Sequence, residues 1–340
     1  MEFSERSRNI LKAVVLRYIK TSFPVGSRSV TQNFGFGLSP ATVRNIMVEL
    51  ENLGYLEQPH TSAGRIPTEK GFRFYVDDLI QETKNLKHIF FSEEYSIEKK
   101  EDISELLKET CRKLSIMSNY AAVVVSPKFS GAILKHIEFI RLRVRIILMV
   151  IVSDDGFIKK GIIEFEEDFT QDELEDISSY LNNRFVGLTL KEIKKEIFSQ
   201  IKEEVVHYDS FLNNALKLGR EAVNTTQENE LFIEGTSNFL DFFDFSEIDK
   251  LKSFLKGIEE RYFILNLLDR CIGAEGIQVF IGSENILPWV EDCSMVLCNY
   301  KRDNEPIGTL GIIGPMRMEY YRVIPLVDYT ANILSEIITD

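Results

Sequence analysis

The sequence predicts an α+β protein in which a small, basic, helical head precedes a larger, acidic body, and three observations lead to this prediction. Residues 1–76 contain three amphipathic helical patterns, separated by tight turns and followed by a loop rich in proline and hydroxyl residues. The remaining residues alternate between helical and strand patterns. Ten lysines and arginines against six acidic residues give residues 1–76 a net charge of +4, which leaves −17 for the rest of the chain. A basic head on an acidic body favours a domain that meets nucleic acid.

The composition limits the class of protein. With 340 residues, of which 44% are hydrophobic and 27% charged, the chain is expected to fold as two or three globular domains. The longest apolar run, residues 146–152, is far shorter than the roughly 20 residues of a membrane helix, and the N-terminus lacks the apolar stretch of a secretory signal. We expect a cytoplasmic protein whose cysteines are reduced and mostly buried: Cys111, Cys271, Cys293 and Cys298.

The elements of the head have clear start and stop signals. A first helix is predicted from Glu5 to Lys20, and Ser27 is expected to cap a second helix that ends at a Gly-Phe-Gly turn. Ser39 caps a third helix, which ends near Leu53 with Gly54 in the left-handed conformation. A short strand at 55–57 and a loop at 59–68 follow. Three helices and a strand-flanked loop within about 75 residues predict a winged helix-turn-helix over residues 1–78.

Residues 79–340 predict a second α+β domain with a mostly helical segment inserted into it. The expected insert covers residues 166–230, where acidic helices begin with the capping boxes Thr170–Glu173 and Thr189–Glu192. The expected elements outside it are a helix at 102–117, strands at 120–125, 133–152 and 157–165, helices over 247–268, strands at 277–281, 295–300 and 307–313, and a last helix at 319–338.

The third helix of the head has the surface of a recognition helix. A helical wheel turns five apolar residues inward, whereas an arginine and an asparagine point outward near the N-terminal end. The inward residues are Val43, Ile46, Met47, Leu50 and Leu53. Arginine and asparagine suit bidentate contacts with guanine and adenine, and small apolar side chains cover a thymine methyl group. The alternative is an ordinary solvated helix face. The residues expected to read bases are Ala41, Thr42, Arg44, Asn45 and Val48.

A second group of residues is expected to contact the DNA backbone. The loop at 59–68 offers hydroxyl groups and one arginine, which suit phosphate or a narrow minor groove. The alternative is a loop that only faces solvent. The residues expected to contact the DNA backbone from the helix starts, the wing and the following turn are Ser27, Arg28, Ser39, His60, Thr61, Ser62, Arg65, Lys70 and Arg73.

Three stretches of the head resemble the bacterial heat-inducible transcription repressor family, HrcA. They are residues 23–28 (FPVGSR), 39–45 (SPATVRN) and 53–71 (LGYLEQPHTSAGRIPTEKG). The resemblance implies a winged helix, a GAF-like domain and a dimerising segment inserted within that domain. It also implies a homodimer that represses chaperone operons through an inverted-repeat operator called CIRCE, with activity supported by the GroEL chaperonin. One position departs from the family, because Ile46 stands where an acidic residue usually follows the Arg-Asn pair.

The sequence gives no catalytic or metal-binding signal. The histidines lack ligand spacing to cysteines or paired carboxylates, and the glycine-rich residues 308–314 lack the Lys-Ser/Thr of a phosphate loop and predict a buried strand. We therefore expect no enzyme, cofactor or metal. Two alternatives stay open. In the first, the body binds a metabolite in a GAF-like pocket, and the candidate lining residues are Tyr262, Phe280, Trp289 and Tyr300. In the second, the head is attached to an enzyme.

Overall fold

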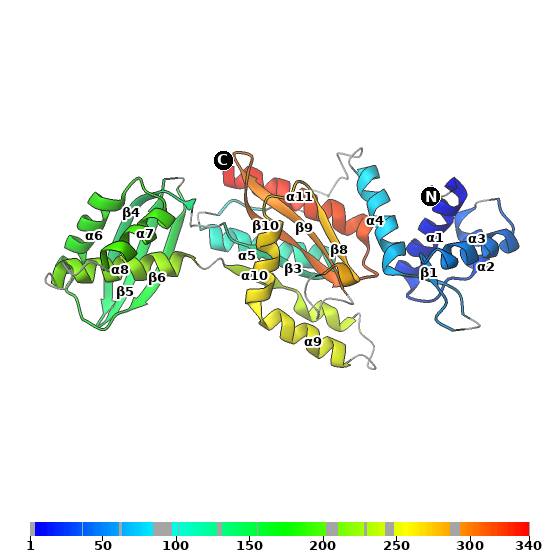
Figure 1. Ribbon diagram of the computed structural model, residues 1–340, viewed down its shortest axis with the longest axis horizontal. Helices are drawn as coiled ribbons and strands as arrows, with labels where there is room; N and C mark the ends of the chain where they lie inside the picture. Colours follow the sequence, from blue (N-terminus) through cyan, green and yellow to red (C-terminus); the bar gives the residue numbers. More distant parts are fainter. Residues whose placement is uncertain are drawn as a thin grey trace. The chain divides into compact units, whose positions relative to one another are not determined.

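The computed structural model describes residues 4–35, 37–60, 63–83, 97–100, 102–127, 131–154, 156–201, 210–227, 230–241, 248–285 and 293–339. Helices and strands are mixed in the α+β manner that the sequence predicts (Figure 1). The chain divides into two compact units. The first unit contains residues 1–98, 108–124 and 231–340, and the second contains residues 99–107 and 125–230.

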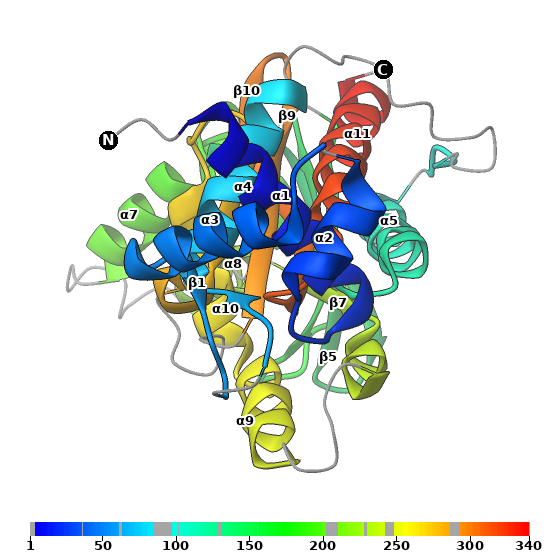
Figure 2. The same cartoon turned by 90° about the vertical axis from the view of Figure 1, so that its right-hand side faces the viewer.

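The N-terminal part of the first unit, here called the head, contains the three helices and the short strand expected from the sequence (Figure 2). A second short strand, inside the expected loop, and a fourth helix were not predicted. Its elements are α1 (Glu5–Thr21), α2 (Ser27–Phe34), α3 (Pro40–Asn52), β1 (Leu56–Glu57), β2 (Ile66–Pro67) and α4 (Glu69–Thr83). Strands β1 and β2 pair antiparallel. Helices α1, α2 and α3 contact one another, and the buried faces of all three form the centre of the head.

The helix caps of the head confirm one prediction and correct another. The Ser39 hydroxyl accepts a hydrogen bond from the Thr42 amide at 3.1 Å, as expected for the N-cap of α3. Gly54 has a φ of +77°, the left-handed value expected after this helix. The prediction for Ser27 was wrong, because Gly26 occupies the N-cap of α2 and Ser27 is the first helical residue.

The rest of the first unit, here called the body, is built around a five-stranded sheet in the order β7-β3-β10-β9-β8. The pairs β3–β10, β10–β9 and β9–β8 are antiparallel. The elements of this region are α5 (Ile103–Ser118), β3 (Ala121–Val125), β7 (Leu231–Glu234), η3 (Thr236–Asp241), α9 (Ile248–Glu259), α10 (Arg261–Cys271), β8 (Gln278–Ile281), η5 (Gly282–Glu284), β9 (Cys293–Arg302), β10 (Glu305–Pro315) and α11 (Tyr320–Thr339).

Helix α11 packs along β9 and β10, and α10 packs on β10. The glycine-rich residues 308–314 lie within β10, as the sequence predicted. Gly308 is required there because an added Cβ would lie 2.3 Å from the hydroxyl of the fully buried Tyr300. The four cysteines are buried and free.

The second unit is a three-stranded antiparallel sheet, in the order β4-β5-β6, with helices packed on it. Its elements are β4 (Leu134–Arg143), β5 (Ile146–Ser153), β6 (Ile158–Glu164), α6 (Gln171–Phe185), α7 (Leu190–Ile201) and α8 (Ser210–Gln227). The sequence predicted one strand over 133–152, but a turn at residues 144–145 divides it into β4 and β5, and Arg145 adopts a φ of +61°. Arginines and apolar residues alternate through residues 141–145, which continues the strand pattern and concealed this turn.

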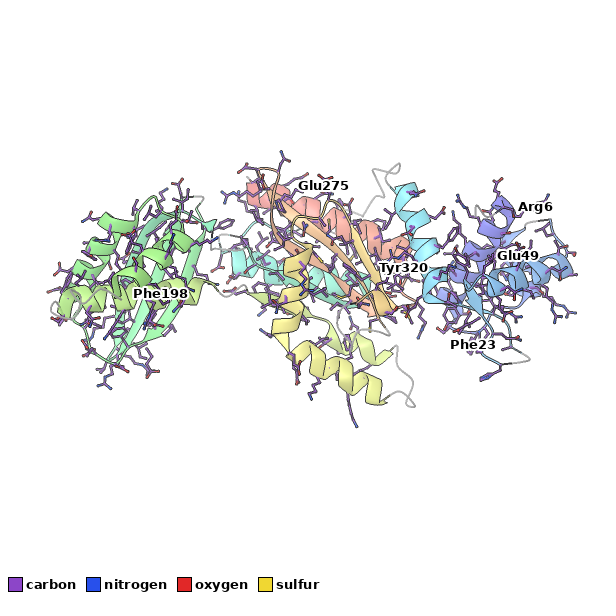
Figure 3. The ribbon with its side chains drawn as sticks, viewed as in Figure 1. Arg6, Phe23, Glu49, Phe198, Glu275 and Tyr320 are labelled. Carbon is purple, nitrogen blue, oxygen red and sulfur yellow. The ribbon has the colours of Figure 1, made fainter. Side chains whose placement is uncertain are left out.

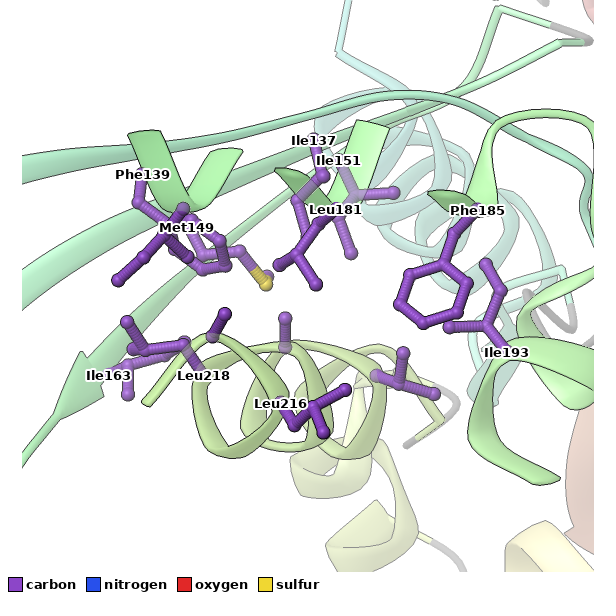
Figure 4. Packing of buried hydrophobic residues seen from close by; sticks show 14 of the residues in the cluster. Ile137, Phe139, Met149, Ile151, Ile163, Leu181, Phe185, Ile193, Leu216 and Leu218 are labelled. Carbon is purple, nitrogen blue, oxygen red and sulfur yellow. The ribbon is translucent and has the colours of Figure 1, made fainter. Parts of the chain in front are cut away.

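The strands of the second unit also correct the expected extent of the insert. Figure 4 shows apolar side chains of the strands, including Phe139 and Met149, facing Leu181 of α6 and Leu216 and Leu218 of α8. Strands β4 to β6 therefore share a core with α6 and α8 and form a sheet separate from that of the body. The compact insert begins near residue 125 rather than at residue 166. The capping boxes of α6 and α7 are both present.

Candidate nucleic-acid interface

Helix α3 leaves one face exposed because the apolar residues of its opposite side are used for packing. Val43, Met47 and Leu50 are at most 3% exposed, and they lie on the side of α3 that packs on α1 and α2. Ile46 is half-buried at the edge of this packed side, and Leu53, which was also predicted to face inward, is exposed at the C-cap of α3. All five residues predicted to read bases are exposed on the remaining face: Ala41, Thr42, Arg44, Asn45 and Val48.

The charge on this face is available to a ligand. In the part of the chain that the structure describes, neither the Arg44 guanidinium on α3 nor the Arg28 guanidinium on α2 pairs with a carboxylate. Both side chains are exposed, and α2 and α3 are in contact. Ser39 is exposed at the start of α3, and Ser27 is half-buried at the start of α2. Two helix N-termini and two free arginines therefore lie on neighbouring helices.

The base of the wing is fixed by a backbone bridge to the segment before α2. The Val25 amide donates to the Arg65 carbonyl at 2.8 Å, and the Arg65 amide donates to the Val25 carbonyl at 2.9 Å. Gly64 allows this close approach, because an added Cβ would lie 2.5 Å from the carbonyl carbon and oxygen of Val25. The Gln58 amide also donates to the Ala63 carbonyl at 3.1 Å. His60 is exposed beside the tip, and the predicted contacts Thr61 and Ser62 lie outside the described residues.

Two cations predicted to contact the DNA backbone are bound to α3 and its C-terminal turn instead of pointing freely into solvent. Arg65 forms an ion pair with Glu51 of α3, with both its Nε and Nη2 atoms 2.8 Å from the same carboxylate oxygen. The Lys70 ammonium donates to the Leu53 carbonyl at 2.9 Å and lies 4.2 Å from the centre of the Tyr55 ring. The sequence analysis did not identify Glu51 as the partner of Arg65, because the two residues are 14 positions apart.

The structure does not bring Arg73 to the α3 face. Its guanidinium contacts Glu284 and the Val279 carbonyl in the body, together with Asp77 one turn along α4. Partial burial works to lower the pKa of Arg73, but the bonds to Glu284 and Asp77 outweigh it and raise the pKa. Arg73 is therefore a structural cation of α4, and the prediction that it contacts the DNA backbone has no support in this geometry.

Three further features of the described residues concern metal binding, membrane spans and cavities. No group of three or more His, Cys, Asp and Glu residues comes together as a possible metal site among the residues described. No helix within the described ranges is long and apolar enough to cross a membrane. A surface cavity of about 760 Å³ lies beside α11, with the polar residues Asn299, Lys301 and Asp328 among those that line it.

Relatives with known names share nearly the whole chain. The family described as the HrcA protein C terminal domain matches residues 104–324. A heat-inducible transcription repressor HrcA from Geobacter sulfurreducens is 41% identical over 342 residues, which cover 99% of this chain and 98% of that protein. The protein of the same name from Syntrophobacter fumaroxidans is 37% identical over 348 residues, covering 100% and 98% of the two chains.

One solved structure has a similar arrangement along the whole chain. It is described as the crystal structure of a hypothetical protein at 2.2 Å resolution, and it matches with a TM-score of 0.68 at 25% sequence identity. The match covers 99% of both chains.

Proposed function

The chain belongs to the HrcA family of heat-inducible transcription repressors, and we propose that it represses chaperone operons by binding a CIRCE-type inverted repeat as a homodimer. The observation that carries this proposal is the exposed face of α3, on which Arg44 and Asn45 have no role in packing. In the proposal, residues 1–78 are a winged helix-turn-helix, and the body is a GAF-like domain. The protein acts in the cytoplasm and has no enzymatic activity.

Base reading falls to the N-terminal half of α3. Arg44 is suited to the two acceptors of a guanine, and Asn45 to the acceptor and donor of an adenine. Ala41 and Val48 offer methyl groups to a thymine, while Thr42 is held beside the helix cap by its contact with Ser39. The side chains come from successive turns of one helix, so they reach neighbouring base pairs in the major groove.

Contacts with the DNA backbone fix the register of α3. The positive ends of the α2 and α3 dipoles attract phosphate, with Ser27, Arg28 and Ser39 beside them. His60, Thr61 and Ser62 of the wing are proposed to contact the backbone further along. Arg65 and Lys70 support these contacts indirectly, because they hold the wing and its following turn against the end of α3.

The second unit provides a surface suited to a second copy of the chain. On the face of the sheet opposite its core, β5 places the half-buried Ile146, Leu148, Val150 and Val152. One cross-strand row on this face is entirely apolar, and it consists of Ile140, Leu148 and Ile162. Ile162 is 67% exposed. Exposed apolar faces of this kind mark interaction sites in proteins that are not embedded in a membrane.

The charged residues beside this apolar row are arranged so that the same face on two copies of the chain would be complementary. The row through Val150 ends in Glu138 on β4 and Lys160 on β6, and the row through Ile146 ends in Arg143 and Glu164. A two-fold axis parallel to β5 would stack β4 of one protomer on β6 of its partner. Glu138 would then face Lys160 of the partner subunit, and Arg143 would face Glu164 of the partner subunit.

The free edge of β4 is unsuited to the same role. Its outward amides at Ile137, Phe139 and Arg141 already donate to Asn182, Ser178 and Gln171 of α6, respectively. A strand whose outward backbone groups are already hydrogen-bonded cannot pair with a strand of a neighbouring copy. We therefore propose that the dimer forms through the face of the sheet, so that two heads read two half-sites about 34–36 Å apart or a multiple of that distance.

The control of repression follows from the resemblance to the family. We propose that the GroEL chaperonin maintains the repressor in its binding form. Chaperonin occupied by heat-damaged proteins then leaves the repressor inactive, and the chaperone operons are transcribed.

The experiment for the DNA-binding role measures fluorescence anisotropy with a CIRCE-type duplex and a scrambled duplex over a series of salt concentrations. We expect the wild type to prefer the operator and Arg44→Ala to lose about 1–3 kcal/mol of that preference. Lys301→Ala, which changes a cation in the body, is the matched control and should keep the preference. If Arg44→Ala kept the operator preference of the wild type, base reading would be assigned to other residues. If the folded wild-type dimer showed no preference, operator binding by the protein alone would be refuted.

The experiment for the dimer exchanges the charges at the edges of the proposed contact. Ile162→Glu should produce monomers in sedimentation velocity, whereas Phe198→Glu, an exposed apolar position on α7, should not. Glu138→Lys should weaken the dimer, and Glu138→Lys combined with Lys160→Glu should restore it. Dimers that persist through Ile162→Glu and both charge changes would refute this face as the interface.

A metabolite-sensing regulator is the second candidate, and it has less support. The cavity beside α11 is lined by polar surface residues, and the Asn299 amide is satisfied by the carbonyls of Cys271 and Ala274. Tyr300 is fully buried against Gly308 rather than lining a cavity. Phe280 is half-buried, while Trp289 and the side chain of Tyr262 lie outside the described residues.

A further inference from the structure

Helix α4 of the head holds one turn of the body between two of its own charged side chains. The Arg73 Nε atom donates to a Glu284 oxygen at 2.8 Å, and the Arg73 Nη2 atom donates to the Val279 carbonyl at 2.6 Å. One helical turn earlier, Glu69 accepts hydrogen bonds from the Ser283 amide at 3.1 Å and from the Ser283 hydroxyl at 2.5 Å. Residues four apart lie on the same side of a helix, so both contacts grip η5 together.

The turn that α4 grips is shaped to receive it. Gly282 has a φ of +54°, and an added Cβ would lie 2.3 Å from a carboxylate oxygen of Glu69. Only glycine tolerates both this conformation and this approach. The Glu284 carboxylate also accepts a hydrogen bond from the Ile281 amide at 2.9 Å, which holds the carboxylate in place for Arg73.

Apolar contacts continue from the polar grip into the body. The rings of Phe72 and Tyr75 lie 6.3 Å and 6.5 Å from the ring of Tyr320. Tyr320, labelled in Figure 3, stands at the start of α11. Tyr320 is fully buried, and its hydroxyl donates to the Met316 carbonyl at 2.8 Å and contacts the Ser294 hydroxyl at 2.6 Å. The body thus offers α4 a fixed aromatic platform rather than an adaptable surface.

The same helix is equally fixed to the rest of the head. Asp78 forms ion pairs with Arg8 and Lys12 of α1, and the rings of Phe72 and Tyr18 lie 6.2 Å apart. Helix α4 therefore belongs to both the head and the body, and rotation of the head on the body would have to break the contacts on one of its sides. The polar contacts at Glu69 and Arg73 are the most exposed of those on the body side.

We propose that Glu69, Arg73 and the turn Gly282–Glu284 form a latch that holds the head in one orientation on the body, and that Arg73 is a positioning residue for operator recognition. The inference rests on the proposed function, because orientation matters only when two heads must meet two half-sites. Two binding modules on a stiff support gain affinity only for the spacing that matches their geometry. A head that can rotate on the body loses part of this gain in affinity for the repeat with the matching half-site spacing. Its affinity also depends less on the spacing.

The experiment compares binding to three kinds of duplex by fluorescence anisotropy: a single half-site, the inverted repeat, and repeats with two or five added base pairs. Arg73→Ala should bind the single half-site as the wild type does, bind the matching repeat roughly tenfold more weakly, and discriminate less between spacings. Arg73→Lys should retain part of the discrimination. Arg322→Ala, which removes an arginine of the body that pairs with its neighbour Glu319, should behave as the wild type.

A second measurement tests the latch without DNA. Spin labels on cysteines introduced at the exposed positions Gln32 and Glu275 report the distance between head and body, since the native cysteines are buried. We expect a narrow distribution in the wild type and a broad one in Arg73→Ala and Glu284→Ala. Unchanged distributions would overturn the latch.

The outcomes separate the latch from the proposed function. Unchanged spacing preference in Arg73→Ala would overturn the positioning role, and an equal loss of single half-site binding would show that Arg73 contacts DNA itself. A wild-type protein with no operator preference would refute the DNA-binding proposal, while the distance measurement would still decide the latch.

Discussion

The outward face of α3 and the wing beside it carry similar residue types but use them differently. Arg44 on α3 and Arg28 on α2 have no acidic partner among the described residues. Arg65 and Lys70, at the wing, are held by Glu51 and by the Leu53 carbonyl. In the helix face, packing is done by apolar residues on the opposite side, so the polar residues stay free. In the wing, the cations Arg65 and Lys70 are used, together with the backbone bridge to Val25, to hold the loop in place.

This difference shows why net charge overstates what the head can offer to DNA. Part of the +4 charge of residues 1–76 is neutralised by carboxylates outside this range, because Lys12 pairs with Asp78 and Arg73 pairs with Glu284. The charge of Arg65 is likewise paired, with Glu51. A cation already bound to a carboxylate must lose that partner before it pairs with phosphate. The free cations of α2 and α3 are therefore expected to provide more of the binding energy than the cations of the wing.

The largest expected effect comes from the base of the wing. Gly64→Ala places a Cβ against the backbone of Val25, so either the bridge between residues 25 and 65 opens or the wing shifts. We expect a loss of roughly 1–3 kcal/mol in the free energy of unfolding, measured by urea denaturation. The matched control is Gly26→Ala, because nothing lies within 4 Å of its added Cβ. Equal stability of the two variants would show that the bridge does not hold the wing.

A smaller effect is expected at the helix caps, where the two helices differ. Ser39 caps α3 through its hydroxyl, whereas the Ser27 side chain is not the cap of α2. Ser39→Ala should cost about 1 kcal/mol in the free energy of unfolding, and Ser27→Ala should change it by less than about 0.5 kcal/mol. Thermal denaturation of the two variants measures the difference. A larger loss in Ser27→Ala would mean that the cap of α2 is misassigned.

Local signals predicted most of the head correctly. The cap at Ser39, the left-handed Gly54 and the inward positions Val43, Met47 and Leu50 all depend on neighbours within a few residues, which a single sequence displays. The cap at Ser27 failed by one position, since Gly26 adopts the extended conformation that a cap requires. The capping boxes at Thr170 and Thr189 were predictable for the same local reason.

Contacts between distant residues could not be predicted in this way. The partner of Arg73 is Glu284, 211 positions away, and nothing in the pattern around Arg73 distinguishes it from a cation that faces solvent. Likewise, alternating apolar residues predict the strands of 133–165 but not the sheet to which they belong. Which surfaces meet is decided by the whole core, such as Phe139 against the helices of the second unit.

The next prediction concerns the salt dependence of operator binding. Each phosphate contact contributes about 0.9 to the slope of log affinity against log salt concentration. Arg28→Ala should reduce this slope by about one unit, because its guanidinium is free in the described structure, whereas Lys70→Ala should leave it nearly unchanged. Anisotropy titrations between about 50 and 200 mM salt measure both slopes. The reverse result, a reduced slope only for Lys70→Ala, would place the wing and not α2 on the DNA backbone.

The smallest expected effect is a pH dependence of stability that arises from Glu284, the acidic partner of Arg73. Partial burial works to raise the pKa of Glu284, but hydrogen bonds from Arg73 and from the Ile281 amide outweigh it and lower the pKa. A lowered pKa means that the charged form stabilises the folded state, so this contribution is complete above the ordinary glutamate range and is lost as the pH falls through the lowered pKa. Glu284 is largely exposed to solvent, which limits the contribution to about 1 kcal/mol or less. The difference in urea midpoint between the wild type and Glu284→Gln should therefore be present at neutral pH and shrink in acid. A difference that stays constant into the acidic range would show that the Glu284 charge does not stabilise the fold, and would leave the Val279 carbonyl and Asp77 as the partners that hold Arg73.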